Sequence, residues 1–357
     1  MAHTYGPIMI LWLGTQPTVI VSTPQAAMEI LNTNDRICSG RCIRSSFRLK
    51  HHIKYSLVWS DCNDYWKLLR KIARNEIFSP KMLQAQSHVR EQKVGELVEY
   101  LRSKEGQVVK LTQFVFGTLL NILGNVVCSR DFFVYSDDND DGNKDVIQNL
   151  IRDMLILGTE PNIADFYPIF DELDLQGLKR KCDERFLRVM KLWKGTVNER
   201  REKRNDDTKD MLDVLLANDF NDAQINALFL ETFGPGPETS SATIEWVMSE
   251  LIKNPKEIAK VRKELDEVLG ASTMKESHLP QLPYLQACIK EAMRLHPATP
   301  LLLPHRAIEA CEVMGYTIPK DCQILDIGTG CACPSTEDSK NGGCSTLPLV
   351  PAMALKS

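Results

Sequence analysis

Two side chains that donate hydrogen bonds lie four residues apart in an amphipathic stretch. In a helix, Trp66 and Arg70 share one face, where an indole N–H and a guanidinium can hold a carboxylate. The same spacing is also typical of an interfacial tryptophan beside a surface arginine. The pattern therefore indicates an anion-binding pair and leaves a purely structural role open.

A second pair, Glu291 and Arg294, lies three residues apart in a segment that is otherwise apolar. If the pair is buried, its charges must be hydrogen-bonded to one another, because breaking such a pair costs about 3–5 kcal/mol. If it is exposed, it contributes little to stability. The pair is a candidate structural ion pair.

A break rich in glycine and proline, residues 234–237, interrupts the long apolar helix predicted over 223–253. A proline inside a helix costs about 3 kcal/mol, so the opened backbone is expected to serve a purpose. Glu238 and Thr239 follow at once and set a carboxylate beside a hydroxyl, a candidate pair for proton delivery. Alternatively, two helices meet here, with Gly236 near an N-cap and Pro237 at a first helical position.

A fourth group, His305 and Arg306, begins an extended segment. Either side chain can reach an anionic group, although such a pair is also common on a protein surface.

The elements that must position these residues are mainly helical. Residues 8–13 and 18–21 predict a hairpin around a turn at 14–17, and a short helix follows from Pro24. Apolar spacing predicts further helices over 61–78, 81–103, 110–128, 144–157, 177–204, 206–219, 223–253, 254–269 and 282–295. Residues 299–304 and 312–318 are predicted to be extended. The fold class is therefore mainly α with a small β region.

Composition narrows the class of protein. The 357 residues are 43% hydrophobic and 25% charged, and the formal net charge is −4, so the chain as a whole is not a polycation built for nucleic acid. Residues 177–204 hold eleven basic and four acidic side chains, typical of a solvated helix face, with an acidic or nucleic-acid partner as the lesser alternative. The 11 cysteines lack the spacing of a disulfide scaffold, which favours a reducing compartment. No apolar stretch reaches the roughly 20 residues of a membrane span.

Taken in order, the four groups resemble the landmarks of a cytochrome P450, a heme-thiolate monooxygenase, of the plant microsomal type. Trp66-x-x-x-Arg70 and Glu291-x-x-Arg294 match two motifs, and residues 303–306 with 315–320 match a third. Residues 235–239 resemble the oxygen-activation motif, with Pro235 at a position where the family has alanine or glycine. The similarity covers residues 5–325.

The resemblance implies a heme b cofactor and a role for each group. Trp66 and Arg70 would hold one heme propionate and His305 would help on the other side. Glu238 and Thr239 would handle protons, and Glu291 with Arg294 would form a buried structural pair. Electrons would come from NADPH through a reductase, and the basic face made by Lys67, Lys71 and Arg74 resembles the surface where such a partner docks.

The family pattern breaks down after Leu325. Residues 344–349 resemble the loop whose cysteine ligates heme iron, so Cys344 is the candidate axial metal ligand, with Thr346 and Gly342 replacing the usual glycine and arginine. We therefore expect residues 1–325 to form the catalytic domain, without an N-terminal anchor, and residues 326–357 to form an abnormal tail that leaves the fold incomplete at its C-terminal end.

The segment 304–320 looks most like the benzylisoquinoline alkaloid branch, whose members include N-methylcoclaurine 3'-hydroxylase and phenol-coupling oxidases. The resemblance implies that O2 and an aromatic alkaloid are the substrates, with no nucleic acid as partner. It places the protein at the cytosolic face of the endoplasmic reticulum, where a chain without the anchor would be soluble or peripheral. Two alternatives stay open: a terpenoid hydroxylase of the geraniol type, and an inactive, shortened product without heme.

Overall fold

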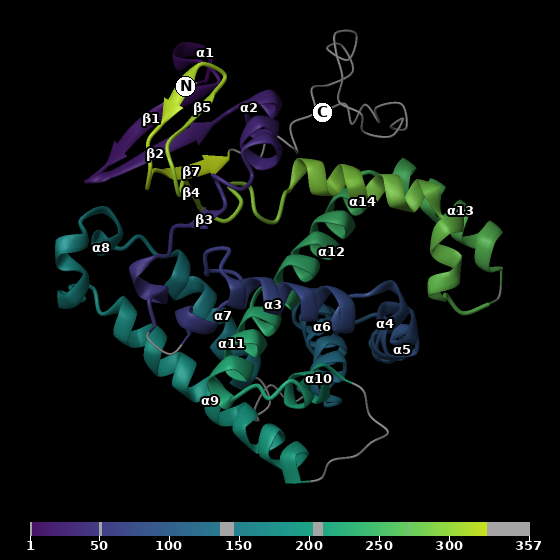
Figure 1. The fold of residues 1–357 in the computed structure, drawn as a ribbon. Helices are drawn as coiled ribbons and strands as arrows, with labels where there is room; N and C mark the ends of the chain where they lie inside the picture. Colours follow the sequence, from purple (N-terminus) through teal and green to yellow (C-terminus); the bar gives the residue numbers. More distant parts are fainter. Residues whose placement is uncertain (1, 50–51, 136–145, 203–209, 271, 327–357) are drawn as a thin grey trace.

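The computed structural model describes residues 2–49, 52–135, 146–202, 210–270 and 272–326, and in these segments the chain is mainly helical with a small β region at one end (Figure 1). This confirms the predicted fold class. The α-helices are α1 (Ala2–Tyr5), α2 (Pro24–Met28), α3 (Asp64–Ile72), α4 (Pro80–Ala85), α5 (Ser87–Ser103), α6 (Leu111–Cys128), α7 (Val146–Thr159), α8 (Ile163–Phe166), α9 (Leu178–Glu202), α10 (Met211–Ala217), α11 (Asp222–Phe233), α12 (Pro235–Lys253), α13 (Pro255–Leu269) and α14 (Pro283–Leu295). Short 3-10 or π turns are η1 (Glu29–Thr33), η2 (Ser45–Phe47), η3 (Ile53–Tyr55), η4 (Ala73–Ile77), η5 (Pro168–Leu173) and η6 (Glu276–Gln281).

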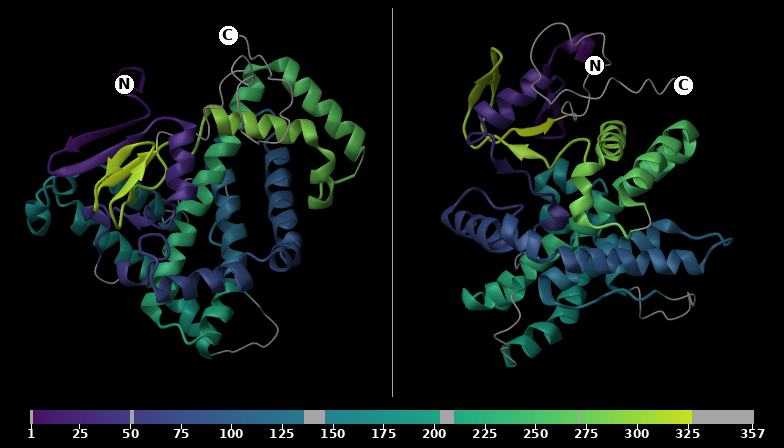
Figure 2. Two further views of the ribbon diagram at one scale, coloured as in Figure 1. Left: turned by 45° about the horizontal axis from the view of Figure 1, so that its top comes forward. Right: turned by 90° about the vertical axis from the view of Figure 1, so that its right-hand side faces the viewer.

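The β region joins the start of the chain to its last described strand (Figures 1 and 2). Its strands are β1 (Ile8–Leu13), β2 (Gln16–Val21), β3 (Gly40–Arg41), β4 (His305–Arg306), β5 (Cys311–Val313), β6 (Tyr316–Ile318) and β7 (Gln323–Asp326). Five of them form a sheet in the order β1-β2-β7-β4-β3, and β5 and β6 form a separate hairpin. β1 and β2 are antiparallel, whereas β2 and β7 are parallel, with Thr18 opposite Gln323. The sheet thereby fixes β4, which carries two predicted site residues.

The helix starts follow local capping. α3 begins at Asp64, three residues later than predicted, because the Asn63 side chain accepts a hydrogen bond from the backbone N–H of Trp66 at 2.8 Å. Asn221 and Gln224 form a capping box that starts α11. These caps set where the site-bearing helices enter the fold.

The predicted break in the long helix is confirmed, and it is a joint between α11 and α12. Gly234 is the N-cap of α12 and Pro235 its first residue, so two helices meet here. The N-cap lies two residues before Gly236, the position that the two-helix alternative predicted. Pro237 also lies in the first turn, where backbone N–H groups have no partner within the helix, so neither proline costs a helical hydrogen bond. A Cβ on Gly236 would lie 2.7 Å from Leu123 Cδ1, so this glycine allows the close packing of α12 on α6.

Three hydrophobic clusters hold the described segments together. The largest surrounds Trp193, Phe229 and Phe233 and joins α9 to α11, the second lies in the β region, and the third joins α12, α13 and α14 through Val247, Leu251 and Ala292. The division into a domain of residues 1–325 and a tail of 326–357 stays a prediction, because residues 327–357 lie outside the described ones.

The prediction of an extended segment over 299–304 is wrong. Leu302 donates its backbone N–H to the Thr299 carbonyl at 3.1 Å and has a positive φ of 53°, so the chain turns here. In the sequence, the apolar run at 301–303 resembles a short strand, but the three leucines are exposed.

α6 is long and apolar enough to cross a membrane by length and composition. Most of that helix is buried, against α5, α10 and α12 among others, as expected of a core helix. A minimum length of about 20 apolar residues does not select α6 as a membrane span in the sequence, because this helix has 18 residues.

Candidate active site

Trp66 and Arg70 lie on α3, as predicted, but their donors are used differently. The Trp66 indole Nε1–H donates to the Leu57 carbonyl at 2.9 Å, which anchors α3 to the preceding loop. Arg70 is exposed and makes no ion pair within the described residues. In this structure, the guanidinium is therefore the donor available to an anion, and the indole is engaged with the protein.

Glu238 and Thr239 lie in the first turns of α12, just after the joint at Gly234. Thr239 donates its hydroxyl to the Pro235 carbonyl at 2.9 Å. The Oε2 atom of Glu238 is buried and has no hydrogen-bond partner among the described residues. A buried carboxylate oxygen is costly without a donor, so this atom can accept a hydrogen bond from a bound molecule.

Glu291 and Arg294 form the expected ion pair on α14. Arg294 donates from Nε and Nη2 to the two carboxylate oxygens of Glu291, at 2.8 and 2.7 Å. The two side chains are 27% and 38% exposed, so the pair is not fully buried in the described structure. Exposure reduces what such a pair contributes to stability, and a position behind a cofactor stays a prediction.

His305 and Arg306 on β4 have different partners. His305 is half-buried and its Nδ1–H donates to the Cys38 carbonyl at 2.8 Å. Burial lowers the pKa of this imidazole, which favours the neutral ring, and Nε2 of that ring is then an acceptor. The predicted contact with a heme propionate therefore requires that His305 be protonated.

Arg306 ties β4 to the entry of α3. Its Nη2 donates to both carboxylate oxygens of Asp61, at 2.9 and 2.8 Å, and its Nη1 donates to Asp321 at 2.7 Å. Because Asp61 lies three residues before α3, the third motif is attached to the first one. Arg306 is thus committed to protein carboxylates.

A further group, which the motifs did not reveal, connects α11 to the same region. Glu231 lies three residues before Gly234 and accepts hydrogen bonds from the backbone N–H groups of Leu57 and Val58. The loop at 56–63 is therefore held from β4, from α3 and from α11. A single glutamate inside an apolar helix is the one signal that the sequence offers for it.

The predicted iron ligand, Cys344, lies outside the described residues, as do Gly342 and Thr346. Within the described residues, no group of three histidine, cysteine or acidic side chains is arranged to hold a metal ion. The described part of the site thus contains an exposed cation, a buried carboxylate oxygen and a hydroxyl, positioned by α3, α12 and β4.

Comparisons with known proteins identify the family of the chain. The sequence model of the cytochrome P450 family matches residues 1–331. The chain is 78% identical over 325 residues to a corytuberine synthase from Coptis japonica, covering 91% of this chain and 66% of that protein. It is 52% identical to a berbamunine synthase from Berberis stolonifera, again covering 91% and 66%, and 49% identical to an (S)-N-methylcoclaurine 3'-hydroxylase from Eschscholzia californica, covering 91% and 67%.

A zebrafish cytochrome P450 solved with progesterone has the same fold, with a TM-score of 0.76 and 23% identity over 92% of this chain and 76% of that one. The chain spans about two thirds of the length of the curated relatives, at 66% for the first two. Since the family pattern extends over nearly all of its described residues, the chain belongs to the cytochrome P450 family.

Proposed function

We propose that this chain acts as a heme-dependent monooxygenase that oxidises a benzylisoquinoline alkaloid, by hydroxylation or by phenol coupling. The observation that carries the proposal is the 78% identity to a corytuberine synthase over 91% of the chain. The two other relatives named above are also an alkaloid synthase and an alkaloid hydroxylase.

The described residues fit a heme group in two respects. Arg70 offers a guanidinium that is exposed and free of ion pairs within the described residues, as a propionate ligand must be. Glu238 offers a buried carboxylate oxygen that lacks a donor. Arg70 and a protonated His305 would hold the propionates, with the Trp66 indole anchoring α3 on the Leu57 carbonyl, and Cys344 would supply the thiolate. When bound, the thiolate-ligated heme supplies the oxidising chemistry, with electrons from NADPH through a reductase.

The residues of α12 supply proton handling. The Thr239 hydroxyl donates a hydrogen bond to the Pro235 carbonyl at 2.9 Å, which leaves its oxygen lone pairs free to accept another hydrogen bond. Glu238 Oε2 is the adjacent atom that can take up and release a proton. The Gly234 joint places both groups in the first turns of α12.

The reductase would dock on the basic face formed by α3 and η4. Lys67, Lys71 and Arg74 are all exposed, and among the described residues Lys67 is paired only with the exposed Asp64, at 3.0 Å. A positive surface of this kind raises the rate of encounter with an acidic partner more than it raises affinity.

We expect the reduced carbon monoxide difference spectrum of the full chain with heme to show a thiolate-type Soret band. That band should disappear in Cys344→Ser and persist in Cys62→Ser, since Cys62 is an exposed free thiol of the same chain. Absence of the band from the unsubstituted chain would favour the heme-free, inactive alternative. A band that survives Cys344→Ser would assign the iron ligand to another cysteine.

The substrate class is tested by titrating the same preparation with (S)-N-methylcoclaurine and, separately, with geraniol. A saturable spectral shift with the alkaloid alone supports the alkaloid proposal. A shift with geraniol alone would replace it with the terpenoid alternative.

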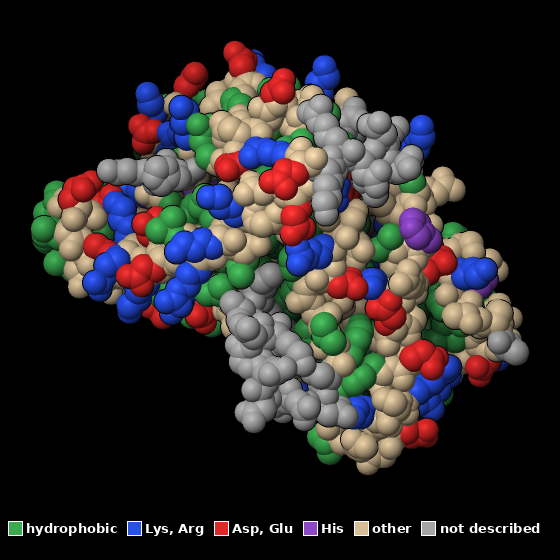
Figure 3. All heavy atoms as spheres, turned by 90° about the horizontal axis from the view of Figure 1, so that it is seen from below, with side chains coloured by type: hydrophobic (Ala, Val, Ile, Leu, Met, Phe, Trp, Pro, Cys, Tyr) green, Lys and Arg blue, Asp and Glu red, His purple; other side chains and the backbone are tan. Residues whose placement is uncertain are grey.

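We also propose peripheral attachment to a membrane through one end of the molecule. Large apolar side chains are exposed around α8 and η5 and at the nearby β1 strand: Trp12, Ile163, Tyr167, Ile169, Leu173 and Leu175. The β1–β2 turn lies against α8, where Thr15 donates its backbone N–H to the Phe166 carbonyl at 2.9 Å. In Figure 3, hydrophobic side chains gather at the left-hand tip, and many Lys and Arg side chains lie beside them. An apolar tip with a basic margin suits an anionic lipid surface.

Vesicles of phosphatidylcholine and phosphatidylserine should therefore bind the full chain in a sedimentation assay. Ile169→Asp is expected to weaken binding by about tenfold or more, because it removes an apolar contact and adds a repelled charge. Val108→Asp is the matched control, since Val108 is fully exposed elsewhere, on the α5–α6 loop. Equal losses in both variants would contradict the assignment of this tip.

A further inference from the structure

Glu231 is a buried carboxylate that binds the backbone of a distant loop. Its side chain is 8% exposed, on the last turn of α11. Oε2 accepts the backbone N–H groups of Leu57 at 2.8 Å and Val58 at 3.3 Å, and Oε1 accepts the Ser56 hydroxyl. Three donors from consecutive residues satisfy the carboxylate, which is what a buried charge of this kind needs.

His52 lies on the other side of the same carboxylate. Its side chain is 2% exposed, and Nε2 lies 3.4 Å from Glu231 Oε1. Neither ring nitrogen makes a hydrogen bond with another described residue, and the ring packs edge-on against Phe186 at 5.7 Å. The carboxylate is thus enclosed by protein and has a fixed position.

The loop that Glu231 holds also holds Trp66. Leu57 donates its N–H to Glu231 and accepts the Trp66 indole N–H at its carbonyl, at 2.9 Å. The Ser56 hydroxyl oxygen additionally accepts the backbone N–H of Trp59 at 2.7 Å. A single residue, Leu57, therefore links α11 to the first turn of α3. Arg70 lies one turn further along the same helix.

We propose that Glu231 is a positioning residue for α3, the helix that carries Arg70. Glu231 fixes residues 56–58, and through the Leu57 carbonyl it fixes the Trp66 indole and with it the orientation of α3. The link to heme rests on the function proposed above. Glu231 does not touch the anion itself. It acts from α11 through two hydrogen bonds in series.

The first test measures the loop and the indole directly, in the full chain without heme. Glu231→Ala should speed hydrogen exchange of the Leu57 and Val58 amides by at least about tenfold, since it removes the charged acceptor of both N–H groups. It should also shift the indole N–H resonance of Trp66, assigned by its loss in Trp66→Phe. Unchanged exchange and an unchanged Trp66 resonance would overturn the proposal.

The matched control is Glu264→Ala. Glu264 also accepts two consecutive backbone N–H groups, from Tyr284 at 2.7 Å and Leu285 at 2.9 Å, but on α13 and away from Trp66. Glu264→Ala should leave the hydrogen-exchange rate of the Leu57 amide and the Trp66 indole resonance unchanged. Glu231→Gln keeps the shape and one acceptor oxygen, and should give a smaller change of the same sign if the alanine variant does not fold.

The second test titrates hemin into the unsubstituted chain and the variants and follows absorbance. Glu231→Ala should weaken hemin binding by about tenfold, and Glu264→Ala should not. Equal hemin affinities in the chain and in Glu231→Ala would overturn the link to heme. If the unsubstituted chain binds no hemin, the proposed heme function fails, whereas the exchange measurement still decides whether Glu231 positions Trp66.

Discussion

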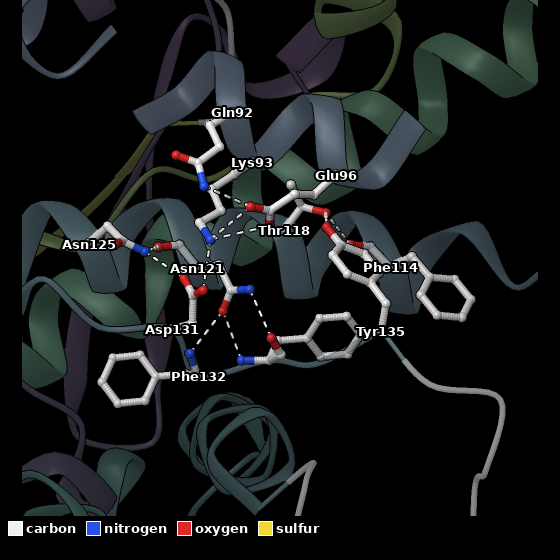
Figure 4. A network of polar contacts seen from close by, with 11 residues as sticks. Gln92, Lys93, Glu96, Phe114, Thr118, Asn121, Asn125, Asp131, Phe132 and Tyr135 are labelled. Atoms are coloured by element: carbon white, nitrogen blue, oxygen red, sulfur yellow. Dashed lines mark hydrogen bonds and ion pairs between the residues drawn. The ribbon is translucent and has the colours of Figure 1, made fainter. Parts of the chain in front are cut away.

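Replacing Asn121 by alanine is expected to lower the free energy of unfolding by about 3 kcal/mol, because one side chain satisfies three backbone groups. Asn121 Oδ1 accepts the N–H groups of Phe132 and Phe133, and its Nδ2 donates to the Phe133 carbonyl, each at 2.8 Å (Figure 4). The side chain is buried on α6, so water cannot replace all three bonds. Denaturant unfolding followed by circular dichroism measures the loss.

Two further variants separate this effect from a general loss of polarity. Asn121→Asp keeps the acceptor oxygen and loses the donor. It should therefore lower the free energy of unfolding by less than Asn121→Ala does. Asn125→Ala removes bonds to the Asn121 carbonyl and to Asp131 in a more exposed position, and should cost less than about 1 kcal/mol. A loss in Asn125→Ala as large as in Asn121→Ala would contradict the explanation.

Local patterns predicted most of the architecture. Apolar spacing gave the helices, and the proline and glycine at 235 and 236 marked a joint that α11 and α12 confirm. The prediction failed at 299–304, where an apolar run lies in a turn stabilised by the Leu302 backbone. A strand and an exposed apolar turn have the same short pattern, so only their contacts distinguish them.

The candidate site was predictable where its residues are close in sequence. The pair of Glu291 and Arg294 forms as the spacing predicts, because three residues bring side chains together on any helix. The contact of Trp66 with the Leu57 carbonyl and that of Glu231 with the Leu57 amide were not predictable. The second joins residues separated by 174 positions, and no local rule gives such a pairing.

The roles of Arg306 and His305 illustrate the same limit. Both belong to one short motif, yet Arg306 is bound to Asp61 and Asp321, while His305 donates to the Cys38 carbonyl. The sheet order decides this division, because β4 lies between β3 and β7. Residue type identified the motif, and the neighbouring strands determined which donor remains available.

Trp193→Ala is expected to lower the free energy of unfolding by about 3–5 kcal/mol, the range for removing a large aromatic side chain from a packed core. Trp193 on α9 is fully buried, with its ring 5.4 Å from that of Phe229 and 5.5 Å from that of Phe233. Phe233 directly precedes the Gly234 joint, so the cavity would also loosen the end of α11 that carries Glu231. The unfolding midpoint in urea measures the first effect, and hydrogen exchange at Leu57 measures the second.

The indole N–H of Trp193 separates volume from polarity in this core. It is buried without a hydrogen-bond partner among the described residues, so Trp193→Phe removes an unsatisfied donor together with part of the ring. Removing the unsatisfied donor stabilises the fold, whereas losing part of the ring destabilises it. The net decrease in the free energy of unfolding should therefore stay below about 1.5 kcal/mol. Trp12→Ala, at a site that is 70% exposed, should change stability by less than about 0.5 kcal/mol. If Trp193→Phe lowers the free energy of unfolding as much as Trp193→Ala does, the indole N–H has a partner that contributes to stability, and the packing argument is wrong. If Trp193→Phe leaves the free energy of unfolding nearly unchanged, the aromatic contacts with Phe229 and Phe233 are what hold α9 against the Gly234 joint.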